Sequence, residues 1–71
     1  MTDTVALNAA IERAGVKRKH ICQSLGLTFT GLAAKVKGES DFKGREIQSL
    51  QEILGLSNEE RDKIFFAPNC D

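Results

Sequence analysis

Apolar residues recur at helical spacing along almost the whole chain, and glycines interrupt that spacing at short intervals. Strand-like alternation is never sustained, so the pattern predicts an all-α protein. A chain of 71 residues has room for one small core, and we expect a single compact domain over residues 1–71 with a C-terminal tail over 67–71. The predicted helices cover 4–14, 18–25, 29–37, 44–54 and a fifth segment that starts after Ser57 and ends before Pro68.

Local signals support these boundaries. Before three of the helices, an apolar residue stands five positions ahead of another, which is the spacing of a hydrophobic staple, and Ser57 with Glu60 forms a capping-box pattern. The staple pairs are Val16 with Ile21, Leu27 with Leu32, and Phe42 with Ile47. The core is predicted to contain Leu7, Ala10, Ile11, Ala14, Ile21, Cys22, Leu25, Phe29, Leu32, Val36, Ile47, Leu50, Leu54, Ile64 and Phe65.

Several classes of protein are disfavoured by the sequence. No apolar run approaches the roughly 20 residues of a membrane span, and the N-terminus has no secretion signal, so a cytoplasmic protein is expected. Cys22 and Cys70 are far apart and only His20 could join them, which supports neither a metal site nor a disulfide. Cys22 is expected in the core and Cys70 as a tail thiol. Neither a nucleophile with a nearby base nor a phosphate-cradling loop is present, so we expect no enzymatic activity and no cofactor.

Charge is segregated along the chain although the formal net charge is zero. Residues 13–45 hold eight basic and two acidic residues, a net charge of +6, whereas residues 46–71 have a net charge of −4. Such segregation predicts one basic surface on an otherwise acidic body.

Basic side chains also occupy two predicted helix starts, where the helix dipole disfavours them by roughly 0.3 to 1 kcal/mol each. Lys17 and Lys43 stand at the cap positions, with Arg18 and Lys19 after the first and Arg45 after the second. Stability alone would not select them, and a docked anion would explain them. The alternative is a solvated basic stretch, which the repetition at two helix starts disfavours.

The segment VKRKHICQSLGLTFTGLAAKVKGES, residues 16–40, resembles the helix-turn-helix of the phage repressor and Cro family, including Xre-type regulators. The matching features are the small residue Cys22, Gly26 in the turn, the cap Thr28, the core residue Leu32 and the Lys-Gly pair that closes the predicted helix 29–37. The resemblance implies a compact five-helix lambda-repressor-like domain with its helix-turn-helix at about 17–38. It also implies that the helix beginning at Phe29 lies in the major groove of double-stranded DNA.

The resemblance assigns roles to individual residues. The residues implied to face bases are Arg18, Thr30, Ala34 and Ser40. The residues expected to bind phosphates are Lys17, Lys19, Thr28, Lys35, Lys37, Lys43 and Arg45. Phe29 stands where many relatives have a base-reading glutamine, and its place on the helical wheel favours the core over contact with a thymine methyl group. Specificity is therefore expected to depend on Arg18, Lys35 and DNA shape.

Two functions follow as expectations. The first is a sequence-specific transcriptional regulator of the phage Cro or repressor type, binding its operator as a homodimer. The second is an antirepressor or antitoxin-like module that binds a partner repressor through the C-terminal end, where Phe65 and Phe66 are candidates for the interface. The alternative for these two phenylalanines is that both close the core.

Overall fold

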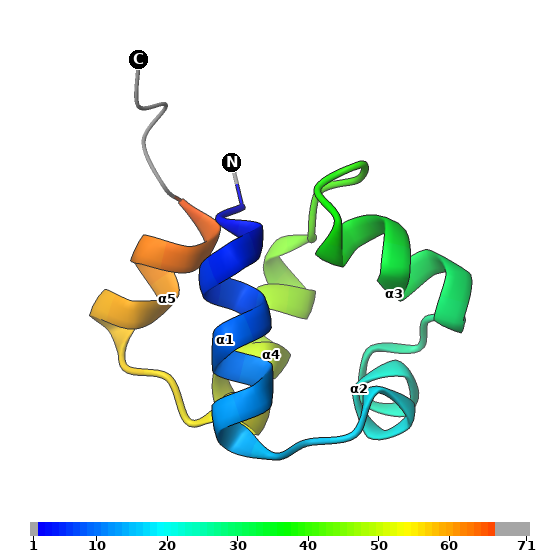
Figure 1. Ribbon diagram of the computed structural model, residues 1–71, viewed down its shortest axis with the longest axis horizontal. Helices are drawn as coiled ribbons and strands as arrows, with labels where there is room; N and C mark the ends of the chain where they lie inside the picture. The colour runs from blue at the N-terminus through cyan, green and yellow to red at the C-terminus, as the bar shows by residue number, and fades with distance from the viewer. Residues whose placement is uncertain (1, 67–71) are drawn as a thin grey trace.

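The computed structural model describes residues 2–66, and within that range it contains five helices and no strand (Figure 1). The helices are α1 Thr4–Ala14, α2 Arg18–Leu25, α3 Phe29–Val36, α4 Gly44–Leu54 and α5 Asn58–Phe65. All five predicted helices are confirmed, and α3 ends one residue earlier than expected. The predicted tail, with its thiol Cys70, lies outside the described residues.

The predicted caps explain where several helices begin and end. Thr28 Oγ1 accepts a hydrogen bond from the Gly31 amide at 3.0 Å, and the Ser57 hydroxyl accepts one from the Glu60 amide at 3.1 Å. Glu60 Oε1 in turn accepts from the Ser57 amide at 3.2 Å, which completes the capping box. Gly26 ends α2 at φ 69°, a left-handed conformation that only glycine adopts without strain.

The core lies where α4 packs against α1, α2 and α5, and α3 closes it against α1 and α2 (Figure 1). Leu7, Ile21, Leu32 and Leu50 are the largest side chains that are fully buried there. Phe42 and Phe65 meet edge to face with their ring centroids 5.5 Å apart, which joins the segment before α4 to α5.

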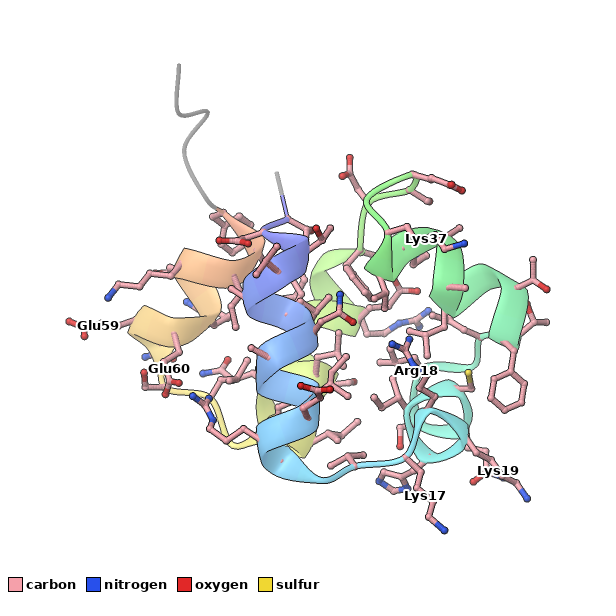
Figure 2. The ribbon with its side chains drawn as sticks, viewed as in Figure 1. Lys17, Arg18, Lys19, Lys37, Glu59 and Glu60 are labelled. Atoms are coloured by element: carbon pink, nitrogen blue, oxygen red, sulfur yellow. The ribbon has the colours of Figure 1, made fainter. Side chains whose placement is uncertain are left out.

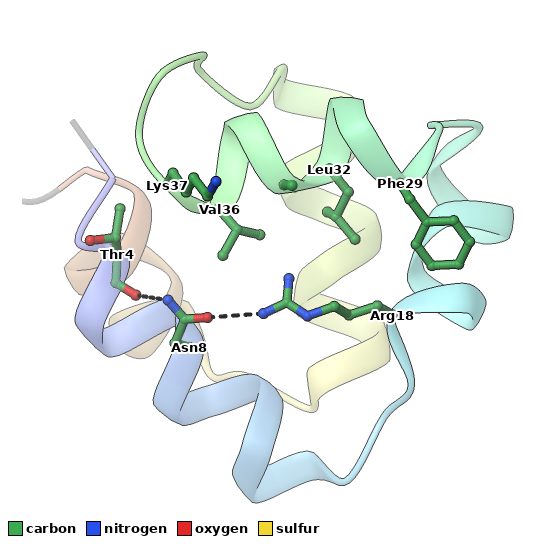
Figure 3. A pocket seen from close by; sticks show the side chains of 8 residues that line it. Thr4, Asn8, Arg18, Phe29, Leu32, Val36 and Lys37 are labelled. Carbon is green, nitrogen blue, oxygen red and sulfur yellow. Dashed lines mark hydrogen bonds between the residues drawn. The ribbon is translucent and has the colours of Figure 1, made fainter.

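Two residues predicted for the core are exposed. Ala14 lies in the last turn of α1, where the chain leaves toward α2. Phe29 is 61% exposed because the first turn of α3 projects beyond the helices that cover Leu32 and Val36 (Figure 3). The prediction of a core position for Phe29 was therefore wrong, and Leu25 is only half-buried.

Candidate nucleic-acid interface

The connection between α2 and α3 consists of three residues, Gly26, Leu27 and Thr28. The Leu27 amide donates to the Cys22 carbonyl at 3.0 Å, and Thr28 caps α3. Both ends of this short turn are therefore hydrogen-bonded to the helices that they join. Because Leu32 and Val36 are buried beneath α3, the turn and the core together fix the direction in which the other face of α3 points.

That outward face includes Thr30 and Ala34, which the resemblance implies face bases. Thr30 and Lys37 are exposed and Ala34 is half-buried. A methyl group added at Gly31 would meet Thr28 Oγ1 at 3.2 Å, so the glycine relieves crowding beside the cap. The Thr28 hydroxyl is exposed and keeps its proton available for an acceptor, since in the cap it acts only as an acceptor.

Lys35 does not belong to this outward face, which corrects its assignment as a phosphate ligand. Its ammonium lies 2.6 Å from Glu46 Oε1, with the two side chains only 11% and 6% exposed, and 5.8 Å from the centroid of the Phe42 ring. Residue 35 lies on the inner side of α3 because it is three positions after Leu32 and next to Val36. The spacing of residue 35 from Leu32 indicated this inner position in the sequence. The charge of the lysine led to its assignment to the surface instead.

Glu46 also changes the interpretation of the α4 start. Its Oε1 accepts a hydrogen bond from the Lys43 amide at 2.9 Å, so this helix start has a carboxylate of its own. Burial acts to raise the pKa of Glu46, but hydrogen bonds from Lys35 and from the Lys43 backbone outweigh it and hold the pKa below its ordinary value. The expectation that both helix starts carry unbalanced positive charge was therefore wrong for α4.

The start of α2 does carry unbalanced positive charge. Its first turn contains no acidic residue, and Lys17 makes no capping hydrogen bond through its side chain. The ion pairs found within residues 2–66 are Arg13 with Glu60, Lys35 with Glu46 and Arg61 with Asp62. The exposed cations outside these pairs are Lys17, Arg18, Lys19, Lys37, Lys43, Arg45 and, on α5, Lys63.

Figure 2 shows how these charges are arranged. Lys17 caps α2, Arg18 and Lys19 begin that helix and Lys37 follows the last residue of α3, whereas Glu59 and Glu60 lie on α5 at the other side of the molecule. Arg45 lines a hollow beside the end of α2, together with residues 23–26. Four of the exposed cations thus gather around α2 and α3, and the exposed carboxylates nearest to them in the sequence are Glu39 and Asp41, in the connection that follows α3. Ser40 is exposed in the connection that follows α3.

An open groove of about 640 Å³ runs along one flank of α3, between α1 and α2 (Figure 3). Its lining residues are Thr4, Asn8, Arg18, Phe29, Leu32, Ala33, Val36 and Lys37. The guanidinium of Arg18 extends across the groove, and its Nη2 donates to Asn8 Oδ1 at 3.3 Å. Asn8 is itself held by a 2.8 Å hydrogen bond from its Nδ2 to the Thr4 carbonyl.

Asn8 is the residue of this region that the sequence analysis missed. Nothing in the local pattern of α1 marks it, because its partner belongs to another helix. A neutral amide can orient a guanidinium and leave its positive charge uncompensated. Arg18 is thus held in place while its charge stays available.

The C-terminal pair of phenylalanines divides between core and surface. Phe65 is 3% exposed and packs on Phe42, so of the two alternatives given for it, a place in the core is confirmed and a partner interface is not. Phe66 is 59% exposed and borders two hollows that share Ile47.

In the part of the chain that the structure covers, no helix is long and apolar enough to cross a membrane. Searches against protein-family models, curated proteins and solved structures found no match to this chain.

Proposed function

We propose that this protein is a small sequence-specific DNA-binding regulator of the phage Cro or repressor type, with a lambda-repressor-like helix-turn-helix fold. The observation that carries the proposal is the group of exposed cations, Lys17, Arg18, Lys19 and Lys37, around a helix whose outer face is exposed. None of the four is in an ion pair within residues 2–66.

The start of α2 is suited to a phosphate group. Free amides and the positive end of the helix dipole meet there, and Lys17, Arg18 and Lys19 add three cationic side chains. The major groove of B-DNA is about 12 Å wide and admits one helix. With α3 in that groove, Thr30 and Ala34 face the bases, while Thr28 and Lys37 contact the backbone on either side.

Regulation follows from occupancy of the operator. Two copies bound to adjacent half-sites, roughly 34 to 36 Å apart, would exclude polymerase from an overlapping promoter. The protein would act in the cytoplasm, where its DNA target is found.

A second candidate function is an antirepressor that binds another regulator. The specific observation in its favour is Phe66, a large exposed ring beside two hollows at the acidic end of the molecule. This function would use α5 and would not need the cations of α2.

A salt titration of binding to duplex DNA tests the first proposal. Affinity should fall steeply with salt, and each lost phosphate contact should reduce the slope of log K against log salt by about 0.9. Arg18→Ala and Lys17→Ala should each lower the slope by about that amount, while Lys63→Ala, which removes an exposed cation of α5, should leave it unchanged. Absence of binding at low salt would overturn the proposal, and undiminished partner binding by Lys17→Glu and Arg18→Glu would favour the antirepressor.

A further inference from the structure

Phe29 is a large aromatic side chain that the fold leaves in solvent at the first turn of α3. The other large hydrophobic residues exposed within residues 2–66 are Val5 on α1 and Phe66 after α5. Of these three residues, Phe29 is the one that lines the same groove as Arg18 and Lys37. Burial of this ring would have contributed stability, and its exposure leaves an apolar surface at the first turn of α3 that a ligand can cover.

The surroundings of Phe29 indicate what covers it. Phe29, Ala33 and Lys37 follow one another at intervals of four residues and form one edge of the groove, and Arg18 crosses that groove from the other side (Figure 3). Phe29 at one end of this edge, Lys37 at the other end and Arg18 across the groove combine an apolar ring with two cations that have no carboxylate partner in the described part of the chain. This combination fits a ligand that is polyanionic and carries apolar groups. This step rests on the proposed function, under which that ligand is double-stranded DNA.

Base edges in the major groove present one apolar group, the C5-methyl of thymine. A phenylalanine ring has no donor or acceptor with which to read anything else on those edges. Its neighbours on the outward face, Thr30 and Ala34, also present methyl groups and have no amide or guanidinium, and the Thr30 hydroxyl is the hydrogen-bonding group of the three side chains. The Phe29 side chain itself is therefore matched to a methyl group.

We infer that Phe29 is a specificity-determining residue that selects thymine by packing against its C5-methyl group. The sequence preference at that position of each half-site comes from an apolar contact, while Arg18 and Lys37 hold the adjacent backbone.

Removal of single thymine methyl groups tests this inference. A duplex is first selected from a randomised pool with the wild-type protein at moderate salt. Copies of it, each with one thymine replaced by deoxyuridine, are then titrated by fluorescence anisotropy. At one thymine in each half-site the wild type should lose about fourfold in affinity, the factor that corresponds to one buried methyl group.

The variants locate that contact. Phe29→Ala should bind the thymine and deoxyuridine duplexes equally at this position, and its thermal unfolding should match the wild type because the ring is exposed. Phe66→Ala removes an equally exposed phenylalanine at the far end of the molecule and should keep the fourfold difference. The loss of a methyl effect in Phe29→Ala alone would support the inference.

Other outcomes overturn it. Tight wild-type binding with no deoxyuridine effect at any position, or an effect that persists in Phe29→Ala, would refute the role of Phe29 and leave the DNA-binding proposal standing. Failure to bind any duplex in the pool would refute both. Loss of a protein partner, but not of DNA, in Phe29→Ala would assign the ring to a protein interface instead.

Discussion

At the scale of single residues, the pairing of Lys35 with Glu46 has the largest structural consequence. Both side chains are nearly buried, and the 2.6 Å contact joins α3 to the start of α4. Taking two charges out of water is costly, and a buried pair is tolerated only while both partners are present. The orientation of α3 therefore depends on a carboxylate that lies outside the outward face.

The variant Glu46→Gln should lower the free energy of unfolding near neutral pH by about 3 kcal/mol, because it leaves the buried Lys35 ammonium without a counter-charge. The pKa of Glu46 is lowered in the folded protein, so its contribution is present above the ordinary value of 4.5 and is lost as the pH falls below that value. The difference between wild type and Glu46→Gln should therefore shrink in acid. Urea unfolding at about pH 7 and about pH 3.5 measures it.

A double variant separates the lost charge from other effects of the substitution. Lys35→Met with Glu46→Gln removes both charges and keeps an amide oxygen that can accept from the Lys43 amide. This double variant should recover much of the loss at neutral pH. Equal stability of the single and double variants, or a difference that does not change with pH, would contradict the assigned role of the ion pair.

At the scale of secondary-structure elements, the sequence predicted nearly all of the helix boundaries. Their determinants are local, as with the Thr28 cap, the Ser57 capping box and the glycine after α2. The errors at Phe29 and Lys35 have a different origin. Whether an edge residue of α3 is covered depends on how far α1 and α2 extend beneath it, and a helical wheel contains no information about the neighbouring helices.

Gly38 shows how one residue sets the position of an element. It ends the turn after α3 at φ 85°, and an added methyl group would meet Thr4 Cγ2 of α1 at 3.3 Å. Gly38→Ala should therefore lower the stability by about 1 to 2 kcal/mol, the cost of a left-handed conformation for alanine. Gly44→Ala is the matched control, because Gly44 begins α4 without a positive φ and with open space around it, and this change should be neutral or stabilising by up to about 1 kcal/mol. Thermal unfolding of both variants measures the contrast, and equal losses would show that backbone conformation at Gly38 is not the cause.

At the scale of the whole molecule, a chain with no net charge has a group of cations around α2 and α3, with Glu59 and Glu60 on α5 at the other side (Figure 2). The sequence predicted this separation, since the basic residues are concentrated between positions 13 and 45. It could not predict which cations would be neutralised. Arg13 on α1 pairs with Glu60 on α5 at 2.9 Å, and Lys35 on α3 pairs with Glu46 on α4. Each pair joins two different helices, so a local sequence pattern does not reveal it.

Arg18 escapes neutralisation because its partner on α1 is an amide. Asn8→Asp would place a carboxylate at that position, about as far from the guanidinium as the present 3.3 Å contact. If the cations of α2 bind DNA, this single change should weaken binding and reduce the salt slope by about 0.9, although neither the cation nor α3 is altered. Ala9→Asp is the matched control, because it adds the same charge to α1 at a neighbouring exposed position that lines the hollow against α5. Anisotropy titrations at several salt concentrations compare the two variants. An equal effect of both on DNA binding would mean that the added negative charge acts on the molecule as a whole. The contact between Asn8 and Arg18 would then have no specific role in binding.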